Sequence, residues 1–218
     1  MSHQSRRGRT VQIKICGITN PSDALDSIEL GADALGFNLY PGSRRYVNIE
    51  AASEWIAKLP AGIRKVAVLV NPMIEQAISV ARLPFIDSLQ LHGNEQPELC
   101  SELAERGISF TKALPMRDEA SLQQPIGFST DSILLDSGTG SAFGGSGQTF
   151  PWSLARRFVQ GHPRFRVILA GGLTAENVAE AIGVVEPAGI DVTSGVEANF
   201  GRKDRSRLRA FISAARHA

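Results

Sequence analysis

Two residues that could transfer protons each follow a short segment with strand character. Cys16 follows residues 11–15, in which apolar and polar side chains alternate, and Asp136 follows the apolar run Ile133-Leu-Leu135. A thiolate can accept a proton, provided that nearby positive charge lowers the pKa of the thiol. A carboxyl group beside an apolar layer loses solvation, which raises its pKa and suits it to donating a proton. We therefore expect Cys16 to be a general base and Asp136 a general acid.

Each of these residues also has a simpler interpretation. An isolated cysteine in a protein is most often a small buried apolar side chain. Aspartate before Ser137-Gly138 is a common turn residue, although the next predicted helix begins more than ten residues later. The position of Cys16 at the end of a strand favours chemistry, because the loops that follow parallel strands form the ligand sites of α/β proteins.

Two glycine-containing turns predict a site for an anion. Gly171-Gly172 precedes a predicted helix, and Ser194-Gly195 follows the last predicted strand. Exposed backbone N–H groups at such positions bind phosphate in many barrels of this class. Either turn alone could equally well be a tight turn that serves only the fold. The presence of both turns favours phosphate binding.

Further polar residues lie within the predicted strands or directly after them. Lys14 would need a carboxylate partner if it pointed into a barrel, and Asp191 is the strand residue that we expect to provide it. His92 has no second ligand of metal-binding type nearby, so no metal site is predicted, and a structural role is as plausible as a binding one. The residues that we expect to bind substrate are Gln90, His92, Gly171, Gly172, Asp191, Ser194 and Gly195, together with Arg44 or Arg45 in the loop after the second predicted strand.

The elements that would position these residues alternate between strand and helix. Strands are expected at 11–15, 34–38, 65–70, 88–91, 109–113, 132–135, 166–170 and 190–193. Helices are expected at 23–30, 49–59, 73–82, 96–106, 118–124, 151–160, 174–182 and 204–216. Eight such units predict a single α/β domain, a (β/α)8 TIM barrel over residues 11–218, with a doubly wound open sheet as the alternative. Residues 1–10 are expected to be a flexible basic tail, and the glycine-rich segment 137–150 a mobile lid.

Composition argues against several classes of protein. The 218 residues carry 23 basic and 22 acidic side chains, so no overall field favours nucleic acid or an anionic membrane. No apolar run approaches the roughly 20 residues that span a bilayer. The two cysteines are far apart and form no CxxC motif, which argues against a disulfide framework or zinc site and favours the cytoplasm.

Taken together, these motifs resemble the phosphoribosylanthranilate isomerase family of tryptophan biosynthesis almost from end to end. The resemblance rests on Lys14-Ile-Cys-Gly-Ile-Thr19, Gly31-Ala-Asp-Ala-Leu-Gly-Phe37, Ser43-Arg-Arg-Tyr-Val47, Leu89-Gln-Leu-His-Gly93, Leu134-Leu-Asp136, Gly144-Gly-Ser-Gly147, Ala170-Gly-Gly-Leu173, Asp191-Val-Thr-Ser-Gly-Val-Glu197 and Gly201-Arg-Lys-Asp204. It implies the rearrangement of N-(5-phosphoribosyl)anthranilate to 1-(2-carboxyphenylamino)-1-deoxyribulose 5-phosphate, without a cofactor. It also implies a small phosphorylated substrate and a monomer or homodimer.

The resemblance assigns roles to individual residues. Cys16 matches the general base of the family and Asp136 its general acid. The acid would protonate the ribose ring oxygen and open the ring to a Schiff base, and the base would remove the C2′ proton. The arginine that pairs with the anthranilate carboxylate falls on Arg45, by register with Ser43, whereas Arg44 stands where many relatives have proline or lysine. A phosphosugar-binding barrel without turnover, or another sugar-phosphate isomerase or epimerase of this fold, is the alternative function.

Overall fold

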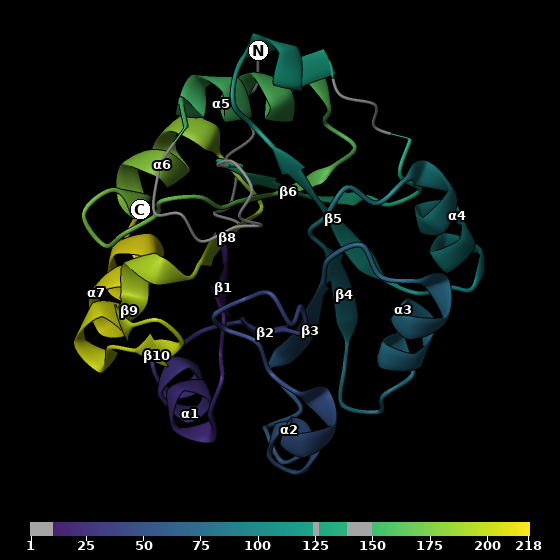
Figure 1. Ribbon diagram of the computed structural model, residues 1–218. Helices are drawn as coiled ribbons and strands as arrows, with labels where there is room; N and C mark the ends of the chain where they lie inside the picture. Colours follow the sequence, from purple (N-terminus) through teal and green to yellow (C-terminus); the bar gives the residue numbers. More distant parts are fainter. Residues whose placement is uncertain (1–10, 124–126, 139–149) are drawn as a thin grey trace.

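Eight parallel strands close into a barrel in the computed structural model, which describes residues 11–123, 127–138 and 150–218. Each strand pairs with the next, and the eighth pairs with the first, so the sheet has no open edge (Figure 1). This confirms the predicted barrel and excludes the open sheet. The strands are β1 (Gln12–Cys16), β2 (Ala34–Asn38), β3 (Arg64–Leu69), β4 (Ser88–Leu91), β5 (Phe110–Pro115), β6 (Ser132–Asp136), β7 (Arg166–Leu169) and β8 (Gly189–Val192).

Helices surround the barrel and begin where the sequence provides caps. The side chains of Asn20, Asn48 and Asp204 each accept a hydrogen bond from a backbone N–H in the first turn of the helix that follows. A 3-10 helix, η1 (Glu119–Gln123), takes the place of an α-helix after β5. The α-helices are α1 (Pro21–Glu29), α2 (Ile49–Ala57), α3 (Ile74–Ala81), α4 (Pro97–Glu105), α5 (Trp152–Gly161), α6 (Val178–Val185) and α7 (Arg205–Arg216).

The two faces of each strand have different surroundings. Outward-facing side chains such as Ile13, Ile15 and Phe37 are fully buried against the helices and form the main apolar core. A much smaller apolar cluster is formed by Ala113, Leu134, Ile168 and Ala170. The rest of the barrel interior contains buried polar side chains, a departure from the aliphatic layers that usually fill such barrels.

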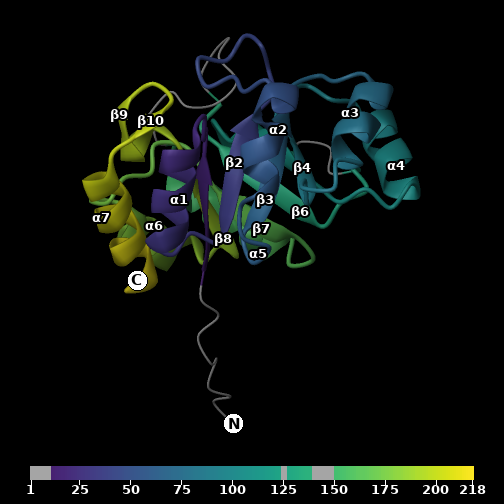
Figure 2. The ribbon, with the colours of Figure 1, turned by 90° about the horizontal axis from the view of Figure 1, so that it is seen from below.

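The structure corrects two expectations in the C-terminal third of the chain. The helix predicted at 174–182 begins only at Val178, because Thr174 donates its backbone N–H to the Asn177 side chain in a preceding turn. After β8 the chain forms a 3-10 helix, η2 (Ser194–Val196), and a hairpin of β9 (Glu197–Asn199) and β10 (Arg202–Lys203), neither of which was predicted. The hairpin lies beside the carboxyl ends of the strands (Figure 2).

Several predictions fall partly or wholly on segments that the structure does not describe. The basic tail at 1–10 and most of the predicted lid, residues 139–149, lie outside the described residues. Within the described part of the chain, no helix is both long enough and apolar enough to cross a membrane.

Candidate active site

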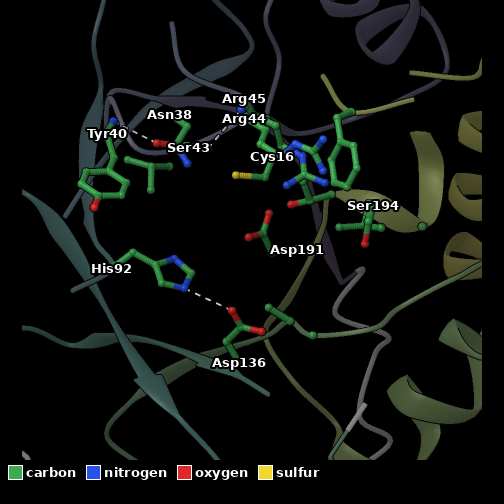
Figure 3. Close-up of a pocket in the computed structure, with 18 of the residues that line it drawn as sticks. Cys16, Asn38, Tyr40, Ser43, Arg44, Arg45, His92, Asp136, Asp191 and Ser194 are labelled. Atoms are coloured by element: carbon green, nitrogen blue, oxygen red, sulfur yellow. Dashed lines mark hydrogen bonds and ion pairs between the residues drawn. The ribbon is translucent and has the colours of Figure 1, made fainter. Parts of the chain in front are cut away.

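A cavity of about 380 Å³ opens where the strands end (Figure 3). Its size falls in the range of small-molecule sites. All the predicted site residues except Gln90 line it, including both Cys16 and Asp136. The lining residues outside that prediction are Gly17, Asn38, Tyr40, Gly42, Ser43, Arg44, Val68, Val70, Ala170, Leu173, Val192, Thr193 and Phe200.

Cys16 lies beside a buried ion pair on one side of the cavity. Lys14 donates from Nζ to Asp191 Oδ1 and to Gln90 Oε1, each at 2.9 Å, which confirms the expected Lys14–Asp191 pair. Burial lowers the pKa of Lys14, but attraction by Asp191 and Cys16 outweighs burial and the net shift is upward. Burial raises the pKa of the Cys16 thiol, and the positive charges of Lys14 and Lys203 only partly oppose this. The thiolate is therefore the minor form near neutral pH.

Asp136 is held from both sides in another part of the cavity. Its Oδ2 lies 3.1 Å from His92 Nε2, and its Oδ1 accepts the backbone N–H of Ser137 at 2.8 Å. Burial alone would raise the pKa of Asp136, as we expected from the apolar strand before it. The hydrogen bond from His92, the electrostatic attraction of that ring and the hydrogen bonds from Ser137 together favour the carboxylate more strongly, so the net pKa shift is downward and that expectation was wrong.

The two adjacent arginines have different environments. Arg45 is buried and donates to Glu197 twice, from Nε at 2.8 Å and from an Nη at 2.7 Å. Lys203 contacts the same carboxylate at 3.2 Å. Burial would raise the pKa of Glu197, but Arg45 and Lys203 outweigh it and the net shift is downward. Both guanidinium groups lie over the ring of Phe200, that of Arg44 at 3.8 Å from the ring centroid and that of Arg45 at 5.1 Å.

The glycine turns are built so that side chains would not fit. Gly171 and Gly172 have φ angles of +82° and +63°, which favour glycine. A Cβ on Gly195 would overlap the backbone oxygen of Leu173, so the η2 turn approaches the turn after β7 closely. Asn177 steadies the first turn by donating to the carbonyl oxygen of Gly172 at 3.0 Å. The predicted anion-binding glycines therefore meet at one edge of the cavity.

Gln90 and three other functional residues show the limits of the sequence argument. Gln90 is only 2% exposed and lies beneath the cavity, between Lys14 and His92. Phe200 and Glu197 come from the unpredicted hairpin, and no local pattern indicates that they contact Arg44 and Arg45 in the loop after β2. Val68 could have been found, because alternation along β3 places it on the inner face. In the described ranges, no three acidic, histidine or cysteine side chains form a candidate metal site.

Comparison with known proteins identifies the family. The family model of N-(5'-phosphoribosyl)anthranilate isomerase matches residues 13–214. The chain belongs to this family. It is 44% identical to the isomerase of Thermotoga maritima over 207 residues, which cover 94% of this chain and 98% of that one. It is 43% identical to the isomerase of Pelobacter propionicus over 206 residues, covering 94% and 96% of the two chains.

Solved structures give the same result. The crystal structure of the Thermotoga maritima isomerase matches with a TM-score of 0.86 at 42% identity, covering 95% of this chain and 100% of that one. A phosphoribosylanthranilate isomerase in complex with reduced 1-(o-carboxyphenylamino)-1-deoxyribulose 5-phosphate matches with a TM-score of 0.83 at 41% identity and the same coverage. The predicted activity, isomerisation of N-(5-phosphoribosyl)anthranilate in tryptophan biosynthesis, is confirmed.

Proposed function

We propose that Cys16 and Asp136 divide the proton transfers of the isomerisation. Asp136 gives a proton to the ribose ring oxygen as the C1′–O bond breaks, which leaves a Schiff base at C1′. Cys16 then takes the proton from C2′, and the resulting enolamine tautomerises to the ketone. The observation that carries this proposal is that a thiol and a carboxyl group from two different strands, β1 and β6, line one cavity.

The pKa shifts in the free protein bear directly on this chemistry. Asp136, with its lowered pKa, is mainly a carboxylate near neutral pH, and Cys16, with its raised pKa, is mainly a thiol. The reactive form, with Asp136 protonated and Cys16 ionised, is therefore a minority. It is also intrinsically reactive, because a carboxyl group of low pKa donates its proton readily and a thiolate of high pKa is a strong base.

We propose that the substrate phosphate binds at the turns containing Gly171-Gly172 and Ser194-Gly195. These turns line the same cavity as Cys16 and Asp136, and at Gly195 a Cβ would overlap a neighbouring backbone oxygen. The complex of the structural relative with a phosphorylated product analogue supports a phosphorylated ligand here. Inorganic phosphate should compete with substrate, and Gly172→Ala should weaken that competition; equal inhibition of both proteins would exclude these turns.

We assign the anthranilate carboxylate to Arg45. Glu197 engages Nε and one Nη of its guanidinium, and this contact fixes the plane of the group while other N–H donors remain on the cavity side. Arg45→Lys should weaken the binding of a product analogue that carries the carboxylate much more than the binding of an analogue that lacks it. Arg44→Lys is the matched control, and the opposite order of effects would move the role to Arg44.

We also propose a homodimer in the cytoplasm. The isomerase of Thermotoga maritima is described as dimeric, at 40% identity to this chain. Cys16 and Cys100 are both buried free thiols, which suits a reducing compartment. Sedimentation equilibrium that gives the mass of a single chain at micromolar concentration would exclude the dimer.

The acid–base assignment is tested with near-isosteric variants. Asp136→Asn keeps the shape but cannot donate an acidic proton, and Cys16→Ser replaces the thiol with a group far harder to ionise. Each should lower kcat by about 10² to 10⁴-fold while the affinity for a product analogue changes little. Cys100→Ser, a buried cysteine in α4, is the matched control and should retain kcat. Near wild-type kcat in both Asp136→Asn and Cys16→Ser would show the assignment to be wrong.

A further inference from the structure

A continuous series of hydrogen bonds joins the two sides of the cavity. It begins at Asp191, passes through Lys14 Nζ to Gln90 Oε1 at 2.9 Å, and continues from Gln90 Nε2 to His92 Nδ1 at 2.9 Å. It ends at Asp136, whose Oδ2 lies 3.1 Å from His92 Nε2. Lys14 and Gln90 are 6% and 2% exposed, so little water competes for these bonds.

The direction of each bond follows from what the groups can donate. A lysine ammonium has only donors, so the Gln90 atom that faces Lys14 must be the carbonyl oxygen. The other end of the amide is then the NH₂ group, which can only donate, and His92 Nδ1 must accept without a proton of its own. The proton of the neutral His92 ring is therefore on Nε2, and it is donated to Asp136.

We propose that Gln90 and His92 are positioning residues that keep Asp136 as the proton donor to the substrate. This inference rests on the proposed role of Asp136 as general acid. If His92 carried its proton on Nδ1, its Nε2 would be an acceptor facing Asp136 and would take a hydrogen bond from the protonated carboxyl group. With the proton fixed on Nε2, His92 can only donate to Asp136, so the acidic proton is left to point into the cavity.

The same series links the acid to the base. Lys14, which sets the orientation of the Gln90 amide, also interacts with Cys16. The ammonium group of Lys14 thus acts electrostatically on the base, Cys16. Through the Gln90 amide it also fixes the tautomer of His92, which donates to Asp136. Gln90 and His92 were predicted to bind substrate; in this proposal they act on the reaction through Asp136.

The tautomer can be measured directly in the free protein. In ¹⁵N-labelled protein near neutral pH, His92 should show a protonated Nε2 and an unprotonated Nδ1. His162 provides an internal reference of the opposite kind, because its Nδ1 lies 3.0 Å from the carbonyl oxygen of Phe158, which can only accept. A protonated Nδ1 on neutral His92 would overturn the proposal, whatever the kinetics of Asp136 variants show.

Two substitutions of His92 separate donation to Asp136 from mere packing. The amide nitrogen of glutamine can reach the position of Nε2, whereas that of asparagine reaches only the position of Nδ1. We therefore expect His92→Asn to lose about 10- to 100-fold in kcat, with a smaller change in KM, and His92→Gln to recover most of that loss. Equal losses in the two variants, with both folded, would contradict a positioning role.

Gln90→Glu tests the direction of the series with almost no change of shape. The new carboxylate still accepts from Lys14 but cannot donate to His92, so His92 must protonate Nδ1 to keep its bond. The NMR signature of the neutral ring should disappear, and kcat should fall by about 10-fold or more. Gln12→Glu adds the same charge at an exposed position at the start of β1 and should leave both the His92 signature and kcat unchanged. An unchanged His92 signature in Gln90→Glu would contradict the proposal.

Discussion

Lys14 and Lys112 are both buried lysines on barrel strands, but their surroundings differ in kind. Lys112 is on the outward face of β5, where it contacts Glu95 Oε2 at 2.8 Å and the carbonyl oxygens of Gly93 and Ala113 at 2.9 Å. Lys14 is on the inward face of β1 and contacts Asp191, Gln90 and Cys16. Each ammonium group has three partners for three protons.

The difference lies in the third partner. The acceptors around Lys112 are one carboxylate and two backbone carbonyl oxygens, and none of them takes part in the proposed reaction, so its function there is structural. Cys16 changes its charge during the proposed reaction, and Lys14 stabilises the thiolate when it forms. A buried cation therefore marks a candidate site only when one of its partners is itself reactive and faces a cavity.

Removing Lys112 should give the largest effect on stability. Lys112→Met leaves Glu95, whose side chain is fully buried, without its ion partner, and should lower the free energy of unfolding by about 3–5 kcal/mol. The kcat of the folded fraction should be unchanged. Chemical denaturation measures the first quantity and initial rates the second. A large loss of kcat in well-folded protein would show that the two lysines are not functionally distinct.

Removing Lys14 should show the converse pattern. Lys14→Met withdraws the cation beside Cys16 and the donor that orients Gln90, so we expect kcat to fall by on the order of 10²-fold. Its effect on unfolding should be smaller than that of Lys112→Met, because Asp191 lines the cavity and can be hydrated from it. A stability loss equal to that of Lys112→Met, with kcat retained, would reverse the comparison.

The pH dependence of kcat/KM sharpens the comparison at the alkaline end. When the acid has the lower pKa and the base the higher, the profile rises through the pKa of Asp136 and falls through that of Cys16. Burial raises the pKa of Cys16 above the ordinary value of 9.0. The alkaline decline of kcat/KM should therefore begin only above about pH 9. Lys14→Met should move this limb to higher pH, whereas Lys112→Met should not. An alkaline limb near pH 7 in the wild type would show that the thiol ionises far more readily than the structure indicates.

The smallest expected effect comes from a single methyl group beside Lys14. A Cβ at Gly36 would lie 2.7 Å from Cys16 Sγ and 3.0 Å from Lys14 Cε, and only 3.2 Å from the Cys16 backbone. Gly36→Ala should therefore displace the thiol and lower kcat severalfold, to a value between those of the wild type and Lys14→Met. Gly62→Ala, where no atom lies within 4 Å of the new Cβ, is the control. Wild-type kcat in Gly36→Ala would mean that the position of Cys16 is not critical.

Local patterns predicted most of the fold and part of the site. Alternating strands, helix caps and glycine stops are properties of neighbouring residues, which is why the eight strands and the two reactive residues at the ends of β1 and β6 could be named. The pKa of Asp136 could not be predicted in this way. The direction of its pKa shift depends on His92, which lies 44 positions away after another strand. A sequence shows the apolar neighbours of an acid but not the hydrogen-bond donors that reach it from distant segments.

The C-terminal hairpin was missed for a related reason. Its strands have three and two residues, too short for a periodicity to be visible. What stabilises the hairpin is long-range contact: Glu197 with Arg45, and the backbone N–H of Lys203 with the Asp23 carboxylate at 2.8 Å. The Lys14–Asp191 pair spans a similar separation but could be inferred, because closure of a barrel brings the first and last strands together.

The contact of Glu197 with Arg45 has a consequence for how the protein is made. Arg45 emerges from the ribosome about 150 residues before the carboxylate that orients it, since the two are separated by 152 positions. Until β9 is synthesised, the arginine assigned to the substrate carboxylate has no fixed direction, however much of the barrel has already formed. Completion of the binding site is thus tied to the last part of translation, because the contact that orients Arg45 forms only after residue 197 has been added.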